Sequence, residues 1–154
     1  MVRKPTFLTE EGRKKISGEL EHIKTVRRTE IAERIQGASD LESTVNNAEY
    51  DDAKNEQAFN EGRILTLEAT LSNASIVRAE PKAKNVAIGS TVTLRGPDGD
   101  ETYTIVGSVE ANPLEGKISN ESPVGQALLG RKVGESVEVK VPSGVQKLKV
   151  VRIK

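Results

Sequence analysis

The sequence contains no cysteine and no tryptophan, and its only aromatic residues are two tyrosines and two phenylalanines. Without cysteine the chain forms neither disulfides nor thiolate metal sites, which fits a reducing compartment. So few rings argue against a base-stacking surface or an aromatic-lined pocket. Long apolar runs are also missing. We therefore expect no signal peptide, no membrane contact and a cytoplasmic location.

An excess of charge of one sign is lacking too, because 23 Lys and Arg residues balance 23 Asp and Glu residues. Bulk charge therefore predicts no nucleic-acid partner, although a local cluster can still bind one. His22 is the single histidine, so neither a histidine metal site nor a catalytic dyad can be built around it. Gly96 and Gly99 fit a hairpin turn and not a phosphate-binding loop. The chain is expected to do no chemistry unassisted.

The composition changes near residue 80. Before that point Glu, Lys, Arg and Ala dominate, whereas valine, glycine and turn residues are frequent after it. The change predicts an N-terminal domain over residues 1–78, a linker over 79–85 and a C-terminal domain over 86–154.

Apolar residues in the first half recur at helical spacing along two segments. Thr9 followed by Glu10 and Glu11 is typical of a helix start, with a hydroxyl cap and acids near the positive end of the helix dipole. The apolar stripes comprise Ile16, Leu20, Ile23, Ile31 and Ile35 in the first segment, and Phe59, Ile64, Leu67, Leu71 and Ala74 in the second. Such narrow stripes predict a long antiparallel coiled-coil hairpin with Phe59 in its core.

A polar stretch separates the two helical segments. Gly37, Thr44 and Val45 weaken helix there, so the turn is expected around residues 38–46, with Asn46 or Asn47 capping the second helix. The stretch carries carboxylates, and it would become the acidic tip of a stiff finger.

The second half predicts a small antiparallel β domain with one short helix. Residues 90–94 alternate polar and apolar, Pro97–Asp100 is a turn signal, and residues 102–106 return as the partner strand. Pro123 opens a short helix that Gly130 ends. Residues 137–141 and 145–153 form the last two strands around the turn at residues 142–144. The fold class is α+β.

Several motifs follow one another in a specific order along nearly the whole chain. They are Val26–Ile31, Asn47–Tyr50, Glu61–Ile64, Leu71–Ala74, Gly89–Thr93 and Ser122–Gly130. With these motifs the chain resembles the GreA/GreB family of bacterial transcript-cleavage (elongation) factors.

The resemblance implies a fold, a partner and a role. The C-terminal domain would be similar to FK506-binding proteins and would dock on RNA polymerase at the rim of its secondary channel. The inserted coiled coil would bring tip acids to the catalytic Mg²⁺, where two-metal chemistry hydrolyses the 3′ end of a backtracked nascent RNA. The chain would then be no enzyme, would hold no cofactor of its own and would act as a monomer.

The tip departs from the family pattern Gly-Asp-Leu-x-Glu-Asn-Ala-Glu-Tyr. A gap-free alignment places Ser43 and Asn46 where the family has its two acids, and neither residue carries a carboxylate. We hypothesise that Asp40 and Glu42 replace that pair as catalytic tip acids and as ligands of the shared Mg²⁺. Alternatively, Asp40 caps a turn and Glu42 is a solvated charge. The chain would then be a channel-binding regulator without cleavage activity.

The resemblance also implies roles for residues beside the tip. Asn47, Glu49 and Tyr50 would support the tip, and Arg27 and Arg28 are candidates for RNA contact. The alternative for both arginines is a place in the salt-bridged faces of a coiled coil.

The C-terminal half offers two further hypotheses. Residues 112–122 are a candidate docking loop. An isomerase or chaperone activity is the third function class, but Tyr103 is the only aromatic residue in this half, and a fold alone does not carry activity.

Overall fold

The computed structural model describes residues 4–40, 48–78, 80 and 84–154. Two compact units emerge, Lys14–Asn73 on the one hand and Met1–Arg13 with Ala74–Lys154 on the other. The first is helical and the second contains the β-sheets, which confirms the α+β class. Residues 79 and 81–83 of the expected linker lie outside the described residues, so its bounds stay a prediction.

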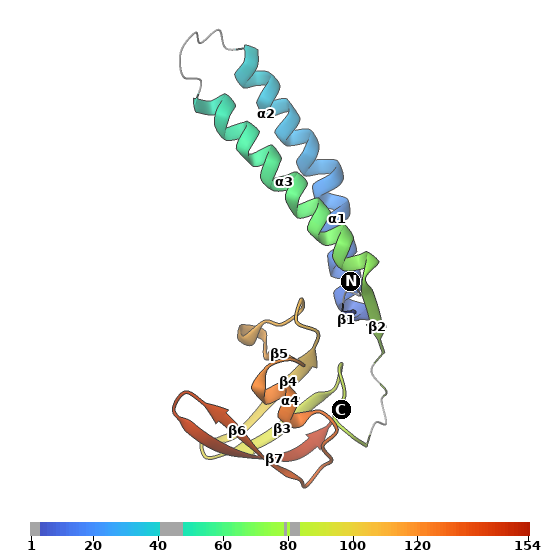
Figure 1. Cartoon of the computed structure of the whole chain (residues 1–154), viewed down its shortest axis with the longest axis vertical. Coiled ribbons are helices and arrows are strands. Elements are labelled where there is room, and N and C mark those ends of the chain that lie inside the picture. The colour runs from blue at the N-terminus through green and yellow to red at the C-terminus, as the bar shows by residue number, and fades with distance from the viewer. Residues whose placement is uncertain (1–3, 41–47, 79, 81–83) are drawn as a thin grey trace. The chain divides into compact units, whose positions relative to one another are not determined.

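The helical unit is a hairpin of two arms that lie side by side (Figure 1). The first arm consists of α1 (Glu10–His22), a π-helical turn (Ile23–Arg27) and α2 (Arg28–Asp40), and the second arm is α3 (Ala48–Ser72). The apolar stripes pair because neither helix would be stable alone in water. The expected hairpin is therefore confirmed. Of its expected turn at residues 38–46, residues 38–40 still belong to α2, and residues 41–46 lie outside the described residues.

The core of the hairpin is narrow and contains one polar side chain. Its buried apolar residues are Ile16, Ile31, Ala38, Ala53, Ile64 and Leu67. The prediction that Phe59 lies between the arms is wrong, since 79% of its surface is exposed. Asn60 takes the inward place at 7% exposure. Successive residues of a helix are turned by about 100° from each other, so residues three or four apart share a face. The buried stripe through Ile64 and Leu67 therefore continues to residue 60, and its neighbour Phe59 points to another side.

The π-helical turn absorbs a shift in the apolar pattern of the first arm. Ile16, Leu20 and Ile23 follow a four-three spacing, but the next buried isoleucine, Ile31, comes eight residues after Ile23 instead of seven. The backbone N–H of Arg28 donates to the carbonyl of Ile23, five residues back. This wider turn holds the extra residue and keeps both parts of the stripe facing α3.

The C-terminal sheet has the strand order β5-β4-β3-β7-β6. Its strands are β3 (Thr91–Gly96), β4 (Gly99–Val106), β5 (Lys117–Ser119), β6 (Ser136–Val141) and β7 (Gly144–Ile153). All pairs are antiparallel except β4 with β5, which run parallel. The two hairpin turns lie where the sequence predicted them, because Gly99 and Gly144 adopt φ values of +118° and +128° that favour glycine.

One face of this sheet packs against α4 (Pro123–Leu128). The core comprises Val86, Val92, Leu94, Ile105, Leu128, Val137, Val139 and Val150. Ser122 caps α4, since its side-chain oxygen accepts from the N–H of Gly125 at 3.1 Å. The alternating pattern of the strands thus places valine and leucine inward and polar residues outward.

The sequence did not predict the short parallel pair β1 (Thr6–Thr9) and β2 (Ala74–Val77). Thr9 does cap α1 as expected, because its Oγ1 accepts from the N–H of Gly12 at 3.0 Å. The carboxylate of Glu110 accepts from the backbone N–H of Thr9 at 2.7 Å. A Cβ at Gly107 would lie 1.7 Å from the carbonyl oxygen of Phe7, so only glycine permits this approach. Within the described residues, no helix is both long enough and apolar enough to cross a membrane.

Candidate functional site

Asp40 is the residue with a carboxylate that the structure describes at the tip end of the first arm. It is exposed and is the last residue of α2. Its Oδ1 accepts a hydrogen bond from Nε2 of Gln36, one turn earlier, at 2.9 Å. Glu42, Ser43, Asn46 and Asn47 lie outside the described residues. The pairing of Asp40 with Glu42 therefore stays a prediction.

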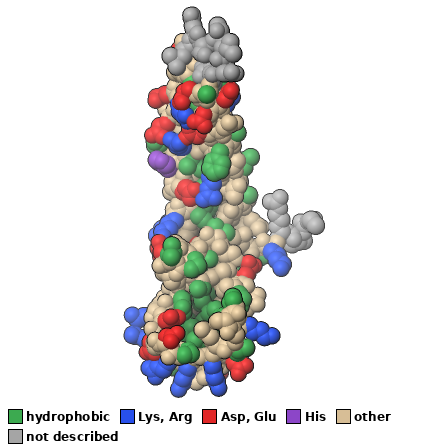
Figure 2. All heavy atoms as spheres, turned by 90° about the vertical axis from the view of Figure 1, so that its left-hand side faces the viewer, with side chains coloured by type: hydrophobic (Ala, Val, Ile, Leu, Met, Phe, Trp, Pro, Cys, Tyr) green, Lys and Arg blue, Asp and Glu red, His purple; other side chains and the backbone are tan. Residues whose placement is uncertain are grey.

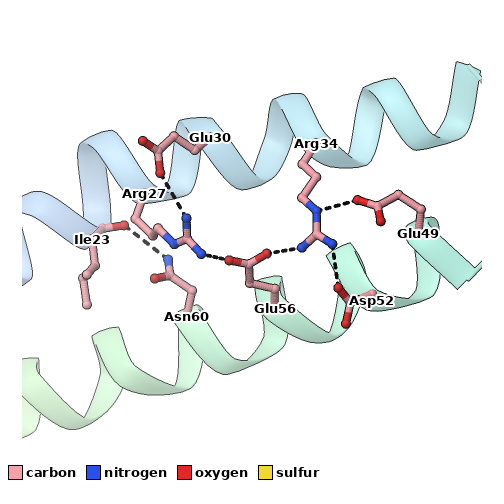
Figure 3. A network of polar contacts seen from close by, with 8 residues as sticks. All are labelled: Ile23, Arg27, Glu30, Arg34, Glu49, Asp52, Glu56 and Asn60. Atoms are coloured by element: carbon pink, nitrogen blue, oxygen red, sulfur yellow. Dashed lines mark hydrogen bonds and ion pairs between the residues drawn. The ribbon is translucent and has the colours of Figure 1, made fainter.

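Glu49 ties the start of α3 to α2. Its carboxylate accepts from Nε of Arg34 at 2.6 Å, and Arg34 also binds Asp52 at 2.5 Å and Glu56 (Figure 3). The pKa of the Arg34 guanidinium is raised above its usual value, foremost by the hydrogen bond to Glu49 and then by that to Asp52. Beside the tip, Glu49 is thus an anchor between the arms.

Glu56 extends this network toward the middle of the hairpin. It bridges Arg34 and Arg27, and Arg27 in turn donates to Glu30 at 3.1 Å (Figure 3). Beyond it, Nδ2 of Asn60 donates to the carbonyl of Ile23 at 3.2 Å. Polar contacts therefore join the two arms along the hairpin, from the π-helical turn of the first arm to the first turn of α3.

Arg27 and Arg28, the candidates for RNA contact, both have carboxylate partners. Arg28 forms a two-pronged pair with Glu61, with both N–O distances at 2.9 Å. The hydrogen bond from Arg28 lowers the pKa of Glu61, and the reciprocal bond raises that of Arg28. A phosphate would have to compete with these carboxylates. RNA contact by either arginine stays a prediction.

Tyr50 lies in the first turn of α3 with 36% of its surface exposed. Its role in supporting the tip stays a prediction. Among the residues that the structure describes, no group of three or more His, Asp or Glu side chains could hold a metal ion.

Sequence reasoning missed Arg34 as the central residue of this region. A signal was present: Glu49, Asp52 and Glu56 are spaced by three and four, which places three acids on one face of a helix. A single arginine that lies opposite these acids on the other arm can hydrogen-bond all three carboxylates, because the guanidinium offers five donors in a planar fork.

The fold and this region define a two-unit protein with a salt-bridged helical hairpin that ends in polar, acid-bearing sequence. Two family descriptions match the chain. "Transcription elongation factor, N-terminal" covers residues 6–76, and "Transcription elongation factor, GreA/GreB, C-term" covers residues 80–154.

Individual relatives match along the full length. "Transcription elongation factor GreA" of Caldanaerobacter subterraneus subsp. tengcongensis is 54% identical, and that of Bacillus subtilis is 51% identical, each with 99% of both chains covered. The solved structure of GreA factor homolog 1 (Gfh1) of Thermus thermophilus is 31% identical with a TM-score of 0.45, covering 98% of this chain and 99% of its own. The chain belongs to the GreA/GreB family of transcription elongation factors.

Proposed function

We propose that this elongation factor binds RNA polymerase, inserts its helical hairpin into the secondary channel and stimulates cleavage of backtracked RNA. The observation that carries the proposal is a paired hairpin whose first arm ends on the exposed carboxylate of Asp40. The 25 residues of α3 correspond to roughly 37 Å at ~1.5 Å per residue. A rod of this length can carry a charge into a narrow channel, and its cross-helix ion pairs favour a single alignment of the arms.

The residues of the tip fit a shared metal better than one of their own. Mg²⁺ takes one or two protein carboxylates together with waters and substrate phosphates. Asp40 and Glu42 would offer such carboxylates to the Mg²⁺ centre of the polymerase, next to the 3′ end of the nascent RNA. When bound there, Mg²⁺ would activate water and stabilise the leaving oxygen. Asp40 would hold its negative oxygen atoms at that place, and the reaction itself would belong to the polymerase.

We propose that the chain acts as a monomeric cofactor for another enzyme. An exposed carboxylate pair binds Mg²⁺ weakly alone, but docking removes most of the entropic cost of bringing the parts together. The chain then needs neither a resident metal nor a substrate pocket.

The test is RNA cleavage in a stalled, backtracked elongation complex with Mg²⁺. The protein should shorten the labelled RNA. Asp40→Asn and Glu42→Gln should each reduce the stimulated rate by on the order of 100-fold, as removal of a positioned catalytic carboxylate does. Asp51→Asn is the matched control, since Asp51 is an exposed acid in the first turn of α3, and it should retain the rate.

Two results would overturn the proposal. Undiminished cleavage in both tip variants would reject the assignment of the acids. A protein that binds the elongation complex and never shortens RNA would be a channel-binding regulator without cleavage activity. Binding measured in the same samples separates lost chemistry from lost docking.

A further inference from the structure

Three acids of α3 converge on the side chain of Arg34. Each guanidinium nitrogen donates to a different carboxylate: Nε to Glu49 at 2.6 Å, Nη2 to Asp52 at 2.5 Å, and Nη1 to Glu56 (Figure 3). The guanidinium is a rigid planar fork. Bonds to three separate partners therefore fix both its orientation and the position of α3 opposite it.

This network lies close to the tip. Arg34 precedes Asp40 by six residues, which is about 9 Å along α2 at ~1.5 Å per residue. Of the cross-arm ion pairs among the described residues, those of Arg34 lie nearest the tip, whereas the pair of Glu19 with Arg63 joins the arms toward their other end. Figure 2 shows acidic and basic side chains close together on the upper part of the hairpin.

Apolar packing specifies the alignment of the arms only weakly in this part of the hairpin. At the level of Arg34 and beyond it, the buried apolar residues are Ala38 and Ala53, beside the half-buried Ile35. The larger buried side chains all lie farther from the tip, and they are Ile16, Ile31, Ile64 and Leu67. Alanine buries little area and has no branched side chain to interlock with the facing helix. Another interaction has to hold the register here.

The spacing of the acids makes the network specific for one register. The positions that face Arg34 carry three carboxylates in the observed alignment. The residues three positions further along α3 are Asp52, Asn55 and Phe59, and those four positions further are Ala53, Glu56 and Asn60. A slip of α3 by about one turn, ~5.4 Å, would thus leave Arg34 with one carboxylate. Polar side chains at single positions fix the register of coiled coils in this way.

The partial burial of the network adds to its effect. Isolated ion pairs on a surface contribute little, but the side chains of Arg34 and Glu56 are only 34% and 22% exposed. Glu49, Asp52 and Glu56 are also neighbours on one helix face, where like charges repel. Removing Arg34 would therefore replace three attractive contacts by repulsion between acids.

We propose that Arg34 is a positioning residue, which fixes the alignment of α2 against α3 and thereby the place at which Asp40 presents its carboxylate. This inference rests on the function proposed above, in which that carboxylate acts at the Mg²⁺ of the polymerase. Arg34 touches neither metal nor RNA and acts through Asp40. A slip of one turn would move the carboxylate by about 5.4 Å, whereas a misplacement of about 1 Å can lower a rate by about 100-fold.

The first measurement follows the alignment in the free chain. Because the sequence contains no cysteine, Ser39→Cys/Asp51→Cys would carry spin labels at these two exposed positions alone. Pulsed electron paramagnetic resonance should give one narrow distance distribution. Arg34→Gln should broaden it or shift it by about one turn, ~5 Å. Arg34→Lys should do the same, since one ammonium nitrogen cannot replace a three-nitrogen fork.

The matched control breaks a cross-arm ion pair elsewhere. Arg63→Gln removes the bond of 2.8 Å to Glu19 and should leave the distance distribution unchanged. Glu49→Gln is a milder variant that keeps the other two contacts of Arg34, and it should broaden the distribution less than Arg34→Gln. Circular dichroism would show that each variant retains its helices.

The second measurement is the rate of RNA cleavage in a backtracked complex at increasing factor concentration. Arg34→Gln should lower the rate at saturation by about 10-fold or more and leave the half-saturating concentration within about 2-fold, because the inference concerns geometry and not docking. Arg63→Gln should retain both values. The double variant Arg34→Gln/Glu49→Gln should be no slower than Arg34→Gln alone, since both residues act through one network.

Three results would overturn the inference: an unchanged distance distribution in Arg34→Gln, a full rate in Arg34→Lys, or an equal loss in Arg63→Gln. Failure of the proposed function gives a different result. If the unaltered chain never stimulates cleavage, that function is rejected, and the distance measurement still decides whether Arg34 sets the alignment. If cleavage is stimulated equally with and without Arg34, the function stands and this inference is rejected.

Discussion

Replacing Gly125 by alanine should destabilise the C-terminal unit, although alanine is normally the better helix residue. Gly125 lies in α4 and is buried. A Cβ at this position would lie 2.0 Å from the carbonyl oxygen of Ser119 and 3.1 Å from the Cα of Asn120, both of them backbone atoms. Neither atom can move aside as a side chain could, so α4 itself has to shift.

The geometry sets the size of the effect. Ordinary contact begins at 3.4 Å, so α4 must move by about 1.4 Å from the Ser119 segment. The shift would also disturb Leu128, which is 0% exposed in the core. Overpacking of this kind costs about 3 kcal/mol at the upper end of the usual range, and the helix propensity of alanine offsets about 1 kcal/mol. We expect a net loss of about 2 kcal/mol and a fall in Tm of roughly 10 °C for a domain of this size.

The assay combines calorimetry with amide hydrogen exchange, which assigns the change to the β-sheet or to the hairpin. The matched variant is Gly62→Ala in the exposed surface of α3, where a Cβ would meet nothing within 4 Å. It should stabilise the hairpin by about 1 kcal/mol. The same chemical change should thus have opposite signs in two helices. Unchanged or increased stability of the Gly125 variant would refute the close contact of α4 with Ser119.

Two further predictions concern the hairpin core and the sheet. Ile64→Ala should lower the free energy of unfolding by about 3 kcal/mol, because the Ile64 side chain is 3% exposed. Phe59→Ala should change that free energy by less than about 0.5 kcal/mol, because Phe59 is 79% exposed. Equal losses for the two variants in chemical denaturation would contradict the assigned core. The hydrogen bond from Tyr103 to Glu101, and then burial, raises the pKa of Tyr103 above its usual 10.0. Glu101→Gln in a Tyr50→Phe background should lower that pKa in a spectroscopic tyrosine titration. Because neutral tyrosine is favoured in the folded state, this stabilisation is complete below the ordinary pKa and lost as the pH rises through the folded value. An unchanged titration would exclude the Glu101 contact.

Most of the fold could be predicted because its signals are local. Thr9 was identified as a cap, Gly99 and Gly144 as turn residues, and Pro123 as the start of a helix, and each of these depends on a residue's own hydrogen-bonding groups or backbone preference. Helical spacing likewise predicted two arms. The predictions for Glu42 and Asn47 stay predictions, because both residues lie outside the described ones. Arg34, the centre of the observed network, was missed because it gave no signal within its own arm.

The sequence by itself determined most of the segments that are helix, strand and turn, although not β1 and β2, and it determined the family through the order of its motifs. Only the tertiary structure decided which side chains meet. It placed Asn60 inward and Phe59 outward, and it joined Arg34 to three acids of the other arm. The physical reason is the difference in the distance along the chain over which these interactions act. Backbone preference acts over a few residues, whereas ion pairing and burial depend on atoms that only folding brings within a few ångströms of each other.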